Sequence, residues 1–285
     1  MSLPSFDDLN SALVPLAIEV GQLILSFYNS DLEVKTKSDD SPVTLADQAA
    51  EKSIIETITS CWPHITIVAE EMCAAGIIPD TNDPETNGTF FLIDPLDGTK
   101  EFINKRDEFT VNIALIVDNT PYYGLVLTPA LGELFITLSE ERSGYLQFSK
   151  KLGELSRDDK IFDQEKFAPI LVRDWPSPGP VGVVSRSHPD DITVEFLKKN
   201  NVVEQIAAGS SLKFCQVARG IADIYPRFGP TMEWDTGAGH AVLCSAGGTL
   251  VTGSGEEFLY GKYDRNYLNG DFVACSKKEL SKIKF

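Results

Sequence analysis

The sequence predicts an α/β protein in two parts, an N-terminal part rich in antiparallel strands and a C-terminal part in which strands and helices alternate. The first part is indicated by short apolar runs separated by turn residues between Phe109 and Phe148, the pattern of an antiparallel meander. The second is indicated by strand-like and helix-like segments that follow one another beyond residue 180. A chain of 285 residues can form two domains, and we place the boundary near 150–180, which gives parts of 1–165 and 166–285.

The N-terminal elements follow from apolar periodicity and from turn residues. In order, we expect a helix over 6–28 that Pro15 can kink, a helix over about 44–60, a short strand over 65–71, an irregular loop over about 74–88, a strand that ends in LIDPLD, and a short helix, TKEFIN. The meander then consists of FTVNIALIV, YYGLVLT, ELFITLS and GYLQF, separated by DNTP, PALG and EERSG.

The C-terminal elements alternate in type. The expected strands are VGVVSRS, VVEQIAA, IADIYPRF, TLVTG and FVACS, and the expected helices are DDITVEFLKKN, SSLKFCQVARG and DTGAGHAVLCSAGG. The second of these helices ends at Gly220, as helices often do. Residues 149–167 form a charged surface excursion between the two parts, for which the sequence offers no function.

The composition restricts the class of partner. The net charge of −17 argues against a nucleic-acid polymer, because proteins that bind one display basic surfaces. It leaves room for a small anionic substrate, since acidic residues that hold divalent cations can form an anion receptor. Five scattered cysteines without a Cys-x-x-Cys spacing indicate reduced thiols. We see in the sequence no apolar run as long as a membrane span and no N-terminal leader pattern. We therefore expect a cytoplasmic protein and leave peripheral membrane association open.

Acidic residues stand where four apolar elements begin or end. They are Asp47, Glu70, the pair Asp94 and Asp97, and Asp235 in EWDTGAG. Each alone has a structural explanation, as a helix cap, a helix-dipole partner or a turn residue. Together they have the composition of a site for a hard divalent cation such as Mg²⁺, which prefers carboxylate, carbonyl, water and phosphate oxygens.

The stretch DPLDGT is the best candidate for the centre of such a site. Pro95 fixes the backbone between the two acids, so that both carboxylates and the carbonyl of Leu96 can face one small volume. Gly98 and Thr99 then offer backbone N–H groups at the start of TKEFIN, which suits a phosphate.

These motifs resemble those of a known family. EE at 70–71, DPLDGT at 94–99 and WDTGAG at 234–239 resemble the signature of the inositol monophosphatase superfamily of magnesium-dependent, lithium-sensitive phosphatases. SPVTLAD, RDEFTVNIAL, SRSHPD, GSSLKFCQVARG and YPRFGP are similar to the 3′(2′),5′-bisphosphate nucleotidases of the CysQ type. The resemblance runs in order from about Lys35 to Ala274. It implies a layered αβαβα sandwich of the sugar-phosphatase type, with a metal-binding N-terminal part and a nucleotide-contacting C-terminal part.

The resemblance also implies a role for each residue. Glu70, Asp94 and the Leu96 carbonyl hold one Mg²⁺, and Asp94 bridges to a second ion that Asp97 and Asp235 complete, with a third ion near Glu70 left open. Thr99 orients the attacking water, and Asp47 acts as the base through the Thr99 hydroxyl. The expected substrate contacts are Gly98, Thr99, His188, Gly209, Ser211, Lys213 and Arg227.

The expected reaction is removal of the 3′-phosphate from adenosine 3′,5′-bisphosphate to give AMP and phosphate. The sulfated nucleotide 3′-phosphoadenylyl sulfate is expected as a second substrate. Two alternatives stay open at this point: an inositol or sugar phosphatase on the same metal site, and a nucleotide sensor without turnover. The sequence leaves the oligomeric state unassigned.

Overall fold

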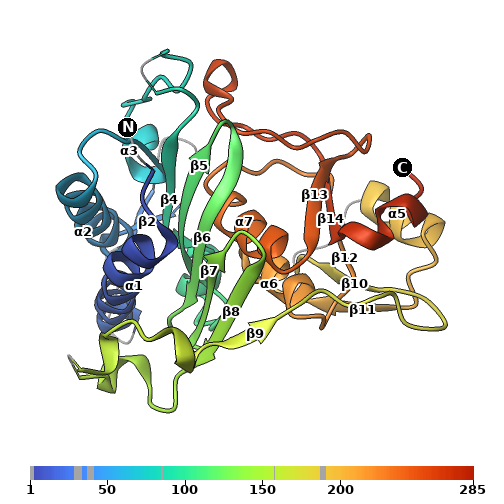
Figure 1. The fold of residues 1–285 in the computed structure, drawn as a ribbon, viewed down its shortest axis with the longest axis horizontal. Coiled ribbons are helices and arrows are strands. Elements are labelled where there is room, and N and C mark those ends of the chain that lie inside the picture. The colour runs from blue at the N-terminus through green and yellow to red at the C-terminus, as the bar shows by residue number, and fades with distance from the viewer. Residues whose placement is uncertain (1–2, 29–33, 37–41, 85, 157, 187–190) are drawn as a thin grey trace.

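The computed structural model of the protein describes residues 3–28, 34–36, 42–84, 86–156, 158–186 and 191–285. It has five layers that alternate between helices and sheets (Figure 1). Two helices cover the outer face of a seven-stranded sheet, two more lie between this sheet and a five-stranded sheet, and one covers the far face of the second sheet. The αβαβα arrangement expected from the family resemblance is therefore confirmed.

The seven-stranded sheet is the expected meander extended at both edges. Its order is β3-β4-β5-β6-β7-β8-β9, and every pairing is antiparallel except that of β3 with β4. The β5–β6 hairpin turns through Asp118 and Asn119, both with positive φ, which matches the twist of the flanking strands. The strands are β3 Thr66–Ala69, β4 Phe90–Asp97, β5 Thr110–Val117, β6 Thr120–Thr128, β7 Glu133–Ser139, β8 Arg142–Gln147 and β9 Ala168–Ile170.

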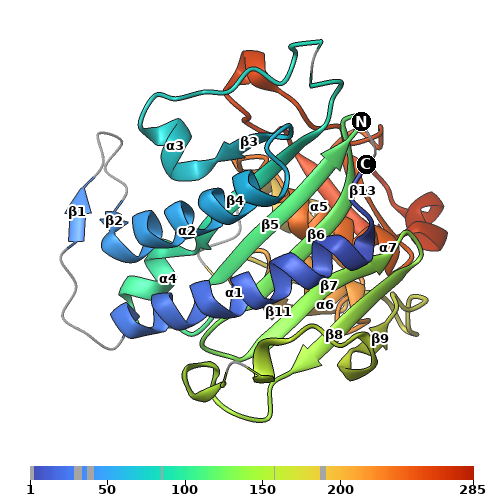
Figure 2. The ribbon, with the colours of Figure 1, turned by 60° about the vertical axis from the view of Figure 1, so that its left-hand side comes forward.

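Helices α1 (Phe6–Tyr28) and α2 (Leu45–Cys61) lie side by side on the outer face of this sheet (Figure 2). The apolar stripe of α1 is buried, and the helix continues through Pro15 without interruption. The buried Asn10 ties it to the sheet, because its amide donates to the Thr137 carbonyl at 3.1 Å and accepts from the Tyr123 hydroxyl at 3.0 Å.

The same helix corrects one expectation about membranes. By length and composition, α1 is the one helix among the described residues that is apolar enough to span a membrane, with a mean hydropathy of 1.5 over its most apolar window. Half of that window is buried inside the protein. Its contacts with α2, β6 and β7 are those of a core helix.

The second sheet has the order β11-β10-β12-β14-β13, in which β10 pairs in parallel with β11 and β12. Helices α6 and α7 pack between the sheets, and α5 packs on β12. The C-terminal elements are β10 Val181–Val184, α5 Asp191–Lys199, β11 Glu204–Ala207, α6 Leu212–Ala218, β12 Ile224–Arg227, α7 Gly237–Ser245, β13 Gly248–Thr252 and β14 Phe272–Ser276. Each alternating element predicted from the sequence is thus present.

The remaining elements are short. They are the β1–β2 hairpin of Val34–Thr36 with Pro42–Thr44, helices α3 Glu70–Ala74 and α4 Thr99–Ile103, and 3₁₀ turns at Leu152–Glu154, Asp158–Lys160, Gln164–Lys166, Tyr263–Arg265 and Lys277–Lys282. One detail differs from expectation: Glu70 and Glu71 do not end strand β3 but form the first turn of α3.

The excursion of residues 149–167 packs on α1, where Gln22 donates to the Leu152 carbonyl at 2.8 Å. The division at residue 165 stays a prediction, and β9 just beyond it pairs with β8.

Candidate active site

The carboxyl end of β4 carries the central pair of acids. Asp94 pairs with Asn112 of β5 and Asp97 pairs with Thr110, and the register shifts between these two pairs. The Leu96 N–H donates to Asp94 Oδ1 at 3.0 Å across this irregularity. Asp94 is buried, with 1% of its surface exposed, so the strand delivers a carboxylate into the interior.

Carboxylates from separate elements converge on Asp94. Burial raises the pKa of Asp94 well above its ordinary range, and the negative charges of Glu70, Asp97, Asp235 and Asp47 raise that pKa further. These groups come from the start of α3, the end of β4, the turn before α7 and the first turn of α2. The structure therefore brings together all the acidic residues that the sequence singles out.

Asp97 and Asp235 are linked through one hydroxyl. Ser211 Oγ lies 3.1 Å from Asp97 Oδ2 and 2.7 Å from the Asp235 carbonyl oxygen. Burial raises the pKa of both carboxyl groups, and for Asp97 the positive charge of Lys213 and the Ser211 hydrogen bonds act in the opposite direction. Ser211 is thus engaged with the acids from the start of α6.

The donor set fits a hard divalent cation. Its members are oxygen ligands, and their mutual repulsion is the kind that a bound cation removes. Across the described residues, no three His, Cys, Asp or Glu side chains already enclose a single-ion site. An ion would therefore have to draw these carboxylates closer together.

Gly98 and Thr99 connect the acids to helix α4. Gly98 has φ +92°, a left-handed conformation that favours glycine, and a Cβ atom there would collide with Ser210 Oγ. That hydroxyl bridges the carbonyl oxygens of Asp97 at 2.8 Å and Glu108 at 3.0 Å. The Thr99 hydroxyl donates to the Leu96 carbonyl at 3.4 Å.

A pocket of about 400 Å³ opens beside Asp97 and Asp235 and is lined by cationic groups. The buried Lys213 donates from Nζ to the Ser210 carbonyl at 2.7 Å, and burial lowers its pKa to about 8 although Asp97 raises it. Arg227 of β12 donates to Ser185 Oγ at 2.8 Å and to the carbonyls of the following turn. The pocket thus joins a cationic wall to the acidic cluster.

Two further carboxylates organise the site and were not found from the sequence. Glu108 binds the Arg186 guanidinium and accepts from the Gly209 N–H at 2.8 Å, and so ties together two segments that line the pocket. Glu51 accepts from the N–H groups of Glu71 at 2.7 Å and Met72 at 2.8 Å. Its spacing of four residues from Asp47 on one helix face was a usable signal.

The other predicted contacts are distributed as follows. Gly98, Gly209, Lys213 and Arg227 line the pocket, and Ser211 lies behind it on the acids. His188 lies outside the described residues. Cys61, Cys73, Cys215, Cys244 and Cys275 are free thiols, as expected.

The fold and the acidic cluster define a phosphatase of the inositol monophosphatase family, to which the chain belongs, since the model of that family matches residues 6–283. Among curated proteins it is 37% identical over 259 residues to the 3′(2′),5′-bisphosphate nucleotidase CysQ of Salmonella typhimurium, covering 90% of this chain and 95% of that one. It is 36% identical over 265 residues to the protein of the same name from Buchnera aphidicola, covering 92% and 91%.

Solved structures agree with this placement. CysQ from Bacteroides thetaiotaomicron superposes with a TM-score of 0.77 at 34% identity, covering 94% of this chain and 97% of the other. An inositol monophosphatase from Anabaena superposes with a TM-score of 0.68 at 22% identity, covering 96% and 92%, and shows the shared fold. The chain is therefore an enzyme, a phosphoric monoester hydrolase.

Proposed function

We propose that the protein is a magnesium-dependent 3′(2′),5′-bisphosphate nucleotidase that hydrolyses the 3′-phosphate of adenosine 3′,5′-bisphosphate to AMP and phosphate. The observation that carries the proposal is the placement of the Asp94 carboxylate cluster next to a pocket walled by Lys213 and Arg227. Hydrolysis of a monophosphate requires the carboxylate cluster, and binding of a substrate with a second phosphate also requires the cationic wall of the pocket. The identity to relatives named for this activity supports the choice of substrate.

The cation ligands in this proposal lie at the end of β4, at the start of α3 and in the turn before α7. Glu70, Asp94 and the Leu96 carbonyl would hold one Mg²⁺, and Asp94, Asp97 and Asp235 would hold a second. When bound, the ions supply positive charge to the phosphoryl oxygens and to the leaving oxygen. The repulsion among the buried carboxylates of this cluster supports the need for such charge.

Thr99 and Asp47 act on the attacking water. The Thr99 hydroxyl stands at the start of α4 next to the Leu96 carbonyl, where it can orient a water toward phosphorus. Asp47, buried in the first turn of α2, accepts the proton through that hydroxyl. The water oxygen forms a new bond to phosphorus as the bond between phosphorus and the 3′-oxygen breaks, which releases inorganic phosphate, and the 3′-oxygen takes a proton from solvent to become the free hydroxyl of AMP.

The pocket binds the part of the substrate that does not react. Lys213 and Arg227 provide the positive charge for the second phosphate, and Gly98, Gly209, Ser211 and His188 complete the contacts in this proposal. Arginine and lysine are the side chains suited to phosphate recognition. In this assignment residues 1–165 supply all the metal ligands except Asp235, and residues 166–285 supply Asp235 and most of the nucleotide contacts.

The cellular setting belongs to the same proposal. The enzyme acts in the cytoplasm, takes 3′-phosphoadenylyl sulfate as a second substrate, is inhibited by lithium, and relieves sulfotransfer from inhibition by its nucleotide product.

The test is a phosphate-release assay with purified protein and Mg²⁺ that compares adenosine 3′,5′-bisphosphate with inositol 1-phosphate. We expect a higher kcat/KM for the bisphosphate, and faster cleavage of inositol 1-phosphate would overturn the substrate assignment. Tight binding of the bisphosphate without phosphate release would identify a sensor. AMP serves as the matched control, because it lacks the 3′-phosphate and should release none.

A further inference from the structure

The turn before α7 presents Asp235 in a fixed orientation. Asp235 Oδ2 accepts from the Met232 N–H at 2.8 Å, and the Asp235 N–H donates back to the Met232 carbonyl at 3.2 Å. No side-chain cap closes the N-terminus of α7 at Thr236. The position of the Asp235 carboxylate therefore depends on the backbone conformation of residues 231–236.

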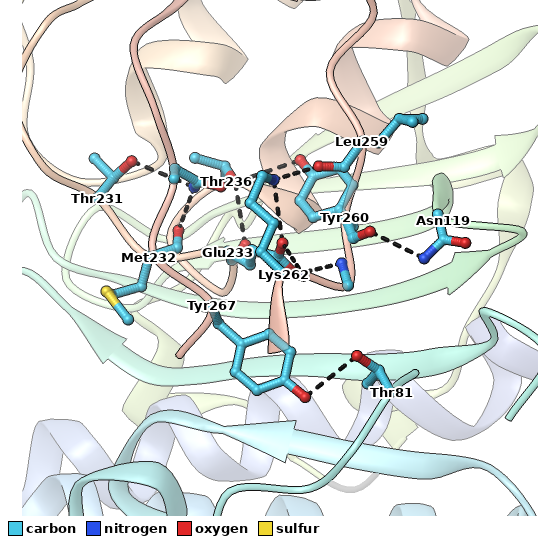
Figure 3. Close-up of polar contacts among 12 residues, drawn as sticks. Thr81, Asn119, Thr231, Met232, Glu233, Thr236, Leu259, Tyr260, Lys262 and Tyr267 are labelled. Atoms are coloured by element: carbon cyan, nitrogen blue, oxygen red, sulfur yellow. Dashed lines mark hydrogen bonds and ion pairs between the residues drawn. The ribbon is translucent and has the colours of Figure 1, made fainter. Parts of the chain in front are cut away.

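Glu233 in this turn makes a second set of contacts, with residues 261 and 262 (Figure 3). Its side chain is fully buried and accepts from the N–H groups of Gly261 at 2.8 Å and Lys262 at 3.0 Å. Lys262 Nζ donates to the same carboxylate at 3.1 Å. A buried carboxylate with these donors holds its backbone firmly, because loss of any of them leaves a desolvated charge.

Asn269 fastens the turn on both sides of Asp235. Its Nδ2 donates to the Met232 carbonyl at 2.8 Å and to Thr236 Oγ1 at 3.2 Å, while its Oδ1 accepts from Lys262 Nζ at 3.2 Å. Glu233, Lys262 and Asn269 thus form one connected network, which we call the 233–262–269 network.

Backbone strain marks the segment that carries the network. Tyr267 is fully buried and has φ +62°, a costly conformation for an aromatic residue. Its carbonyl accepts from the Glu233 N–H at 2.9 Å, and its hydroxyl donates to Thr81 Oγ1 at 3.3 Å (Figure 3). The surrounding contacts hold the segment in this conformation against the turn.

We infer that Glu233, Lys262 and Asn269 are positioning residues that set the Asp235 carboxylate for cation binding, although none of them belongs to the acidic cluster. The inference rests on the proposed role of Asp235 as a Mg²⁺ ligand. Residues that orient a ligand through such contacts control metal affinity without touching the ion. The network acts on Mg²⁺ binding through Asp235 and through no other ligand.

The experiment is calorimetric titration of Mg²⁺ alone into the full-length protein, its Asn269→Ala and Asp235→Asn variants, and the double variant. We expect Asn269→Ala to weaken Mg²⁺ binding roughly 10-fold. In the Asp235→Asn background the same substitution should have no further effect, because the residue on which the network acts is already neutral. Lys262→Met keeps the apolar part of the side chain and should weaken Mg²⁺ binding as Asn269→Ala does. It replaces Asn269→Ala in the experiment if Asn269→Ala fails to fold.

A matched control separates positioning from general loss of stability. Asp223 is also buried and binds Arg173 at 2.8 Å and the Val181 N–H at 2.7 Å, but it immediately precedes β12 and lies outside the network. Asp223→Asn should lower the stability and leave Mg²⁺ affinity unchanged.

Two results overturn the inference. If Asp235→Asn weakens Mg²⁺ binding but Asn269→Ala and Lys262→Met do not, or if the losses add in the double variant, the network does not position Asp235 and the metal site stands. If Asp235→Asn itself leaves Mg²⁺ binding unchanged, the proposed metal role of Asp235 fails together with the inference.

Discussion

Substitution of Gly98 by alanine tests whether the sharp connection between β4 and α4 is needed for the site. Gly98 has φ +92°, and the new Cβ would collide with Ser210 Oγ. Gly247→Ala is the control, because Gly247 has φ +88° and the nearest atom to its new Cβ is Val172 Cγ2 at 3.5 Å, an ordinary contact. The two variants share the backbone strain, and only Gly98→Ala adds the collision.

The magnitudes follow from these two contributions. An alanine in the left-handed region costs roughly 1–2 kcal/mol, and the stiffer unfolded chain offsets about 0.4–1 kcal/mol of that. We therefore expect Gly247→Ala to lower the free energy of unfolding by about 1 kcal/mol. Gly98→Ala also displaces the two Ser210 hydrogen bonds, at roughly 0.5–1.5 kcal/mol each, for a total of about 2–4 kcal/mol.

The assays are urea unfolding and phosphate release. Gly98→Ala should lose most turnover, since it moves Thr99 and the Asp97 carbonyl, whereas Gly247→Ala should keep the activity of the unsubstituted protein. Equal losses of stability in the two variants, or full activity in Gly98→Ala, would refute the reasoning.

Three further predictions concern the charged groups. Asp94→Asn should reduce turnover by at least about 100-fold, yet in metal-free buffer it should stabilise the fold at pH 7. Burial and neighbouring carboxylates raise the pKa of Asp94 in the folded protein. As pH rises above the pKa of Asp94 in the unfolded chain, ionisation therefore favours the unfolded state, and the metal-free fold loses stability. A lower melting temperature for the variant at pH 7 would contradict this. Lys213→Ala should raise KM for the bisphosphate more than it lowers kcat, and in the unsubstituted protein KM should rise as pH passes about 8, where burial places the pKa of Lys213; a KM independent of pH between 7 and 9 would remove Lys213 from substrate binding. Mg²⁺ at 100 times its Kd should raise the free energy of unfolding by about 2.7 kcal/mol relative to protein in chelator, as measured by thermal unfolding. The control is protein in buffer that contains neither chelator nor added divalent cations.

The layers of the fold were predictable because local sequence patterns determine their helices and strands. Short apolar runs with turn residues between them predicted strands β5 to β8, and the alternation of strand-like and helix-like segments beyond residue 180 predicted the second sheet. The acids were predictable for a related reason, since a carboxylate at the end of a buried strand such as β4 requires a partner.

The supporting contacts were not predictable, because they join residues distant in sequence whose types are common. Glu108 reaches Arg186 across 78 residues and Gly209 across 101, and Glu51 reaches the N–H of Glu71 across 20. Nothing local distinguishes Glu108 from the acids on the surface, and the local signal for Glu51 is limited to its spacing of four residues from Asp47 on one helix face. The start of α3 at Glu70 was missed because a five-residue helix carries too little periodicity to be separated from the strand before it.

The attachment of α1 to the sheet has a consequence for synthesis of the chain. Asn10 contacts Tyr123 and Thr137, which follow it by 113 and 127 residues. A nascent chain therefore carries this apolar helix through the translation of more than a hundred residues before its sheet face exists. Until then the apolar stripe of α1 lacks the sheet face on which it packs in the folded protein, and the Asn10 contact to Thr137 can form only after β7 has been made.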